Sequence, residues 1–174
     1  MTSPKPVPRG VTVPPGTGLR AYGGLAGHLG CAIVVLRPGG EMMPHLSIEY
    51  DAATAQRVDM KSFCTSMRDA MAATEVFPLG GIRVRGFQAD HAVIADGDPA
   101  HGFVDMSLRM GAGRDQATRL RVAEALYAAA ETALRPAIGS APFMLSLELR
   151  EIDPDLSIKR WSTVHGHLAA RAGL

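Results

Sequence analysis

Residues 43–49 carry the side chains of this chain that are best suited to chemistry. Pro44 follows a methionine, and a chain that began at Pro44 after removal of Met43 would have a free secondary amine at its N-terminus. Such an amine can accept and donate a proton, whereas a proline inside a chain has a tertiary amide with neither a proton nor a basic lone pair. We therefore take Pro44 as a candidate general acid/base, provided that it is the first residue of the mature chain.

Two further segments, a predicted strand and a turn, carry arginines that could hold an anion. Arg83 and Arg85 alternate with apolar residues over 82–88, so they project from one face of a predicted strand. That placement is typical of a face that is wet, paired with acids or in contact with an anionic ligand. Arg114 ends the glycine-containing turn 111–114 before a predicted helix, where unpaired N–H groups and a full positive charge suit a carboxylate. The alternative for Arg114 is an ordinary strand-to-helix turn with a solvated side chain.

The composition narrows the class of protein. The chain has 174 residues, 47% hydrophobic and 20% charged, with a net charge of +1, which suits one soluble domain. The near-neutral balance argues against nucleic acid and membrane surfaces as partners, and no apolar run approaches the roughly 18 residues of a spanning helix. The two cysteines, Cys31 and Cys64, show no metal-ligand spacing. We expect single thiols, no metal and a reducing cytoplasm.

The N-terminal part differs from the rest in composition. Residues 1–42 hold six of the twelve prolines and nine of the nineteen glycines but one acidic residue, Glu41. This predicts a Pro/Gly-rich disordered extension over 1–43, followed by a domain over 44–174. The extension is either a natural flexible segment or sequence translated from upstream of the true start. In the second case Met43 is the initiator and is removed.

Residues 44–174 have the pattern of an α+β domain. Alternating segments predict strands at 44–50, 82–88, 103–110 and 143–149, and further short strands at 92–95 and 156–164. Helical spacing predicts helices at 58–74, capped by Asp59, and from Asp115 to residue 134, with 51–57 as a polar link. Met67 and Met71 line the first helix, where core packing is favoured over a ligand-facing stripe. The order predicts two β-α-β units forming one sheet with two helices on one face. Oligomerisation would cover the other face.

Taken together, six blocks resemble the 5-carboxymethyl-2-hydroxymuconate isomerase family of the tautomerase superfamily. They are PHLSIE (44–49), FPLGGIRVR (77–85), ADG (95–97), FVDM (103–106), GAGR (111–114) and VH (164–165). The resemblance implies a tautomerase-like fold, a homotrimer, an anionic small-molecule substrate and no cofactor or metal. It also implies an isomerase that ketonises 5-carboxymethyl-2-hydroxymuconate or a related unsaturated dienol in homoprotocatechuate catabolism.

The same resemblance assigns roles to residues. Pro44 would be the general acid/base, and Arg83 and Arg114 would hold substrate carboxylates. His45 would touch substrate or make a structural hydrogen bond, and Phe77 would line the pocket or pack under its turn. Arg85, His165 and His167 are read as surface or interface residues, and Ser162-Thr163 replaces an expected asparagine pair.

Two alternatives to this function remain from the sequence. One is another enzyme of the superfamily, of the 4-oxalocrotonate type, acting on a different unsaturated acid. The other is a non-catalytic trimeric binding or scaffold protein, which would follow if residues 1–43 stayed attached, because Pro44 would then be an amide.

Overall fold

A computed structural model describes residues 43–173 of the chain, so the prediction of disorder for residues 1–42 lies outside the described residues. The elements are β1 (His45–Tyr50), α1 (Ala52–Arg57), α2 (Met60–Ala73), the 3-10 helix η1 (Leu79–Gly81), β2 (Arg83–Gln88), β3 (Gly102–Gly111), α3 (Gln116–Ile138), β4 (Phe143–Ile152) and α4 (Val164–Ala172).

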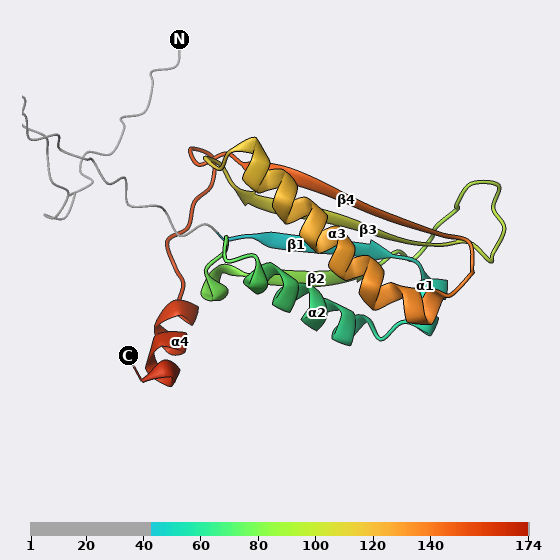
Figure 1. Ribbon diagram of the computed structural model, residues 1–174, viewed down its shortest axis with the longest axis horizontal. Helices are drawn as coiled ribbons and strands as arrows, with labels where there is room; N and C mark the ends of the chain where they lie inside the picture. The colour runs from blue at the N-terminus through green and yellow to red at the C-terminus, as the bar shows by residue number, and fades with distance from the viewer. Residues whose placement is uncertain (1–42, 174) are drawn as a thin grey trace, which may run out of the picture. The chain divides into compact units, whose positions relative to one another are not determined.

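The four strands form one mixed sheet in the order β2-β1-β3-β4. β1 is parallel to β2 and antiparallel to β3, and β3 is parallel to β4. The chain therefore contains two β-α-β units, β1-α2-β2 and β3-α3-β4, and α2 and α3 both lie over the same face of the sheet (Figure 1). This confirms the predicted α+β fold with both helices on one face.

The hydrophobic core lies between that sheet face and the two long helices. Alternate residues of β1 and β3 are fully buried, and so is the apolar stripe of each helix. Met67 and Met71 are 0% exposed, which confirms that these methionines belong to the core. Burial of each such side chain contributes about 1.5–3 kcal/mol. The main contributors from the strands are Leu46, Ile48, Val104, Met106, Leu108 and Met110, and those from the helices include Phe63, Val122 and Leu126.

Both predicted helix caps are confirmed. The Asp59 carboxylate accepts hydrogen bonds from the backbone N–H groups of Lys61 and Ser62, at 3.0 and 3.2 Å. The Asp115 carboxylate accepts one from the N–H of Thr118 at 2.7 Å. Each cap satisfies donors that a helix N-terminus leaves open, which typically stabilises the helix by about 1 kcal/mol.

Two helical boundaries differ from the predictions. Residues 52–57 form α1 rather than a polar link, because the buried Asp51 caps them and accepts a hydrogen bond from the N–H of Ala53 at 2.9 Å. α3 continues through Pro136 to Ile138 instead of stopping at residue 134. Proline removes one backbone hydrogen bond there, but Ile138 packs against the core, and that packing holds the last turn in place.

The two short strands predicted at 92–95 and 156–164 are wrong. Residues 89–101 form a loop, and residues 153–163 run without regular structure until α4 begins at Val164. A strand requires a neighbour to take up its hydrogen bonds, and neither segment pairs with a described strand. Leu156 and Ile158 are consequently 83% and 76% exposed. Among residues 43–173, no helix is long and apolar enough to cross a membrane.

Candidate active site

Most of the predicted site residues come together at one end of the sheet, where β1 and β2 start. Pro44 directly precedes β1 and is buried. Its carbonyl oxygen accepts a hydrogen bond from the backbone N–H of Arg83, the first residue of β2, at 3.1 Å. Because β3 runs antiparallel to β1, the turn 111–114 that follows β3 lies at the same end. Strand direction thus gathers Pro44, Arg83 and Arg114 from three distant parts of the chain.

Arg114 is held in a defined orientation. Its guanidinium donates to the carbonyl oxygens of Gly111 at 3.1 Å and Val76 at 2.9 Å. The same guanidinium stacks on Phe77, with 5.5 Å between Cζ and the ring centroid, a cation–π contact. Phe77 is 6% exposed, so it packs under the turn that it begins and also supports the guanidinium of Arg114. Partial burial lowers the pKa of Arg114, which nonetheless remains charged.

Arg83 lies beside Met43, the residue whose removal would make Pro44 the N-terminal residue. Its Nη1 is 2.8 Å from the Sδ of Met43, and the side chain is half-buried. The Met43 thioether therefore occupies the space next to the Arg83 guanidinium.

His45 is surrounded by cations. Its cross-strand partners are Arg83 on β2 and Arg109 on β3. Burial lowers the pKa of His45 most, and the nearby positive charges lower this pKa further. These charges belong to Arg83, Arg85, Arg109 and Lys159. No hydrogen bond joins the His45 ring to another side chain within residues 43–173, so the structural hydrogen bond considered for this residue is not found there.

The C-terminal helix is anchored next to this end of the sheet. The His165 ring packs against Gly80 in η1, so closely that a Cβ at Gly80 would lie 2.6 Å from His165 Nδ1. His165 is thus half-buried within its own chain rather than simply on the surface, whereas His167 is exposed as expected.

Sequence reasoning missed Arg109, although the alternation of 103–110 already placed it on the same face as Ser107.

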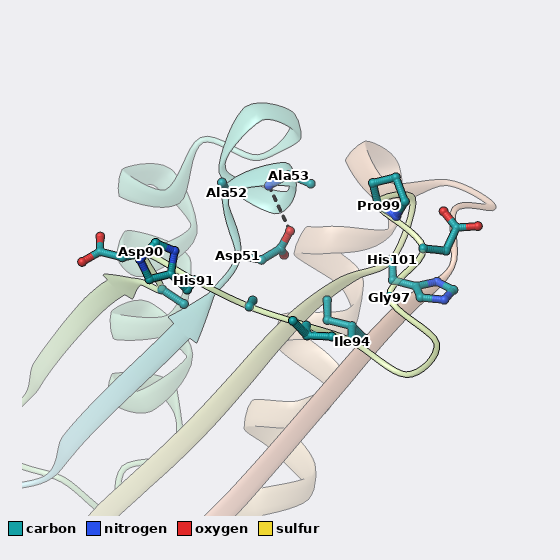
Figure 2. Close-up of a pocket in the computed structure, with 13 residues that line it drawn as sticks. Asp51, Ala52, Ala53, Asp90, His91, Ile94, Gly97, Pro99 and His101 are labelled. Carbon is teal, nitrogen blue, oxygen red and sulfur yellow. Dashed lines mark hydrogen bonds between the residues drawn. The ribbon is translucent and has the colours of Figure 1, made fainter.

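A separate cavity of about 580 Å³ lies at the opposite end of β1 (Figure 2). The start of α1 and the loop 89–101 form its walls, and Figure 2 shows the carboxylate of Asp51 pointing to the N–H of Ala53. None of the predicted site residues lines this cavity. Its one buried carboxylate already caps α1 and also accepts from the N–H of Phe103 at 3.0 Å, so its role is structural.

The fold is similar to those of solved structures. It resembles the crystal structure of a 5-carboxymethyl-2-hydroxymuconate delta-isomerase with a TM-score of 0.68 and 30% identity, covering 74% of this chain and 94% of that one. It resembles a 5-carboxymethyl-2-hydroxymuconate isomerase from Deinococcus radiodurans R1 with a TM-score of 0.67 and 26% identity, over 74% and 96% of the two chains. The two β-α-β units and this similarity place the chain among the isomerases of the tautomerase superfamily.

The sequence comparisons specify the family. The family model of 5-carboxymethyl-2-hydroxymuconate isomerase matches residues 44–168. The 5-carboxymethyl-2-hydroxymuconate Delta-isomerase of Escherichia coli is 32% identical over 123 residues, which are 71% of this chain and 97% of that protein. The chain belongs to the 5-carboxymethyl-2-hydroxymuconate isomerase family, and the resemblance found in its sequence is confirmed.

Proposed function

We propose that this enzyme ketonises 5-carboxymethyl-2-hydroxymuconate, or a closely related unsaturated dicarboxylic or tricarboxylic dienol, in the breakdown of homoprotocatechuate. The gathering of Pro44, Arg83 and Arg114 at one end of the sheet is the observation that carries the proposal. It is supported by the family match, which begins at Pro44. The reaction is proposed to run without a cofactor, since it moves one proton and changes no oxidation state.

Pro44 supplies the acid/base step if it is the N-terminal residue. Its amine accepts the proton of the enol hydroxyl, the O–H electron pair forms the carbonyl, and the conjugated double bond shifts. The ammonium then returns the proton to the distant carbon, so the amine is regenerated. A positioned acid/base of this kind typically contributes about 10² to 10⁴ in rate. Burial and neighbouring arginines would each disfavour the charged form of such an amine, which suits a base that has to be neutral near pH 7.

Arg83 and Arg114 bind the substrate through its carboxylates. Each charge-assisted hydrogen bond is worth roughly 1.5–3 kcal/mol. Both arginines also stabilise the negative charge that develops on the carbonyl end of the conjugated system. Arg114 is already oriented by its bonds to Gly111 and Val76, so little of its conformational freedom is lost on binding.

We also propose that three copies assemble through the sheet face opposite α2 and α3. That face carries charged side chains from all four strands, whereas α2 and α3 both cover the other face (Figure 1). The segment after β4 adds exposed apolar side chains, Leu156, Ile158 and Trp161, which a partner copy would cover. Sedimentation equilibrium of the active enzyme should give three times the chain mass, and a fully active monomer would exclude this assembly.

The test of the function combines mass and turnover. Intact-mass analysis of the protein from its native host should give a chain that starts at Pro44, and this chain should ketonise the tricarboxylic dienol in an ultraviolet assay. A panel of dienols with one, two and three carboxylates separates the proposed substrate from one of the 4-oxalocrotonate type. Activity confined to a monoacid would exclude our substrate. A native protein that retains residues 1–43 would exclude Pro44 as the base and favour a binding or scaffold role.

A further inference from the structure

A row of four basic side chains crosses the sheet face opposite α2 and α3, at the end where Pro44 lies. Strand register places Arg83 beside His45, His45 beside Arg109, and Arg109 beside Arg150. All four side chains point away from the core because their neighbours along each strand are the residues that pack under α2 and α3. Since adjacent strands are about 4.8 Å apart, this basic row spans about 14 Å.

Such a row is unfavourable without an anion, since like charges directly opposite each other on neighbouring strands repel. Arg150 forms an ion pair with Glu148. No carboxylate within residues 43–173 forms an ion pair with Arg83 or Arg109. Of the other acids on this face, Glu49 and Asp105 are four residues further along their strands, which is about 13 Å away. Glu148 lies diagonal to Arg109, but it forms the ion pair with Arg150.

The middle of the row is uncharged at neutral pH. Burial and the flanking arginines lower the pKa of His45, so its ring stays neutral between two guanidinium groups. A neutral imidazole can donate one hydrogen bond to an anion and does not add to the charge repulsion. Arg83 and Arg109, about 10 Å apart across two strand spacings, can therefore both reach a single elongated polyanion that lies over His45.

We propose that Arg109 is a third carboxylate ligand of the substrate site. This inference rests on the proposed function, in which the substrate is a dienol with three carboxylates. Arg83 and Arg114 account for two of these carboxylates. Arg109 lies at the same end of the sheet, is exposed on the basic row and forms no ion pair with a described residue, so it is suited to the third.

The test measures binding as well as turnover, in a chain that begins at Pro44. The probes are propane-1,2,3-tricarboxylate and glutarate, which differ by one carboxylate, and their Kd values are measured by calorimetry. Arg109→Gln should weaken tricarboxylate binding by about 10-fold or more and change glutarate binding little, since one charge-assisted contact is lost. Arg109→Lys should recover part of the loss. Arg121→Gln, which removes an exposed arginine from α3, is the matched control and should change neither Kd.

The outcomes separate this inference from the proposed function. Equal Kd values for Arg109→Gln and the unsubstituted enzyme would overturn the role of Arg109, even if the enzyme ketonises the dienol. A different result is an unsubstituted enzyme that is inactive on the dienol, while Arg109→Gln still weakens tricarboxylate binding. That result would refute the proposed reaction but support Arg109 as a carboxylate ligand. If Arg109→Gln instead dissociates the assembly in sedimentation velocity, Arg109 pairs with an acid of a second copy, and the inference is wrong.

Discussion

The carbonyl oxygen of Pro44 accepts a hydrogen bond from the backbone N–H of Arg83, and this one bond ties the start of β1 to the start of β2 at 3.1 Å. A parallel pairing of strands requires a crossover, here α2, so the two residues are brought together by an element that carries none of the candidate site residues.

Replacement of Pro44 by alanine should lower kcat by about 10² to 10⁴, because a primary amine in a mobile first residue replaces the constrained secondary amine. The thermal midpoint should fall only slightly. The substitution removes two methylene groups from a buried position, but most of the core lies further along the strands. In a chain that starts at residue 44, stopped-flow ketonisation measures kcat and thermal melts measure the midpoint. Pro99→Ala, in the exposed loop 89–101, is the control. An unchanged kcat in Pro44→Ala would remove proline from the mechanism.

Replacement of Phe77 should distinguish packing from the support of Arg114. Phe77→Ala should destabilise the protein by about 3–5 kcal/mol, because it opens a cavity at a nearly buried site. Phe77→Leu keeps most of the volume but loses the ring under the guanidinium, so it should cost less than about 1.5 kcal/mol and still raise KM. Urea unfolding and steady-state kinetics measure the two effects. A normal KM in Phe77→Leu would show that the aromatic ring does not orient Arg114.

The pKa of His45 should lie below its ordinary value of 6.5, because burial and the surrounding cations disfavour the imidazolium. The folded-state pKa is lower than the unfolded one, so the stability from this group is complete above about pH 6.5 and is lost as the pH falls through the folded-state pKa. NMR titration of the ring protons gives the pKa directly. The variant Arg109→Gln removes one of these cations and should raise the pKa of His45. A pKa at or above 6.5 in the unsubstituted enzyme would contradict the placement of His45 among these cations.

Gly80→Ala should detach α4 from η1. The added Cβ would lie 2.6 Å from Nδ1 and 2.8 Å from Cε1 of His165, so the ring has to shift out of its contact with η1. Hydrogen exchange at the amides of 164–172 should therefore become faster. Gly166→Ala is the matched control, since nothing lies within 4 Å of its Cβ position and alanine should favour this helix by about 0.5–1 kcal/mol. Unchanged exchange in Gly80→Ala would show that this contact does not hold α4.

The sequence alone determined the features that depend on neighbouring residues. Alternation located the four strands, helical spacing located α2 and α3, and Asp59 and Asp115 marked where these helices begin. Six short blocks taken together, from Pro44 to His165, were sufficient for the family. These signals are local, because a strand face or a helix cap is set by residues two to four positions apart.

Tertiary structure decided the features that depend on long-range pairing. The register of β3 against β1 puts Arg109 opposite His45, although 64 positions separate them in the chain (109 minus 45), and no local pattern encodes that partner. The segments 92–95 and 156–164 have the alternation of strands but no described neighbour to pair with, so they form none. α3 runs past Pro136 because Ile138 packs on the core. Hydrogen-bond partners and burial are properties of the assembled fold, which is why the sequence could nominate side chains but not bring them together.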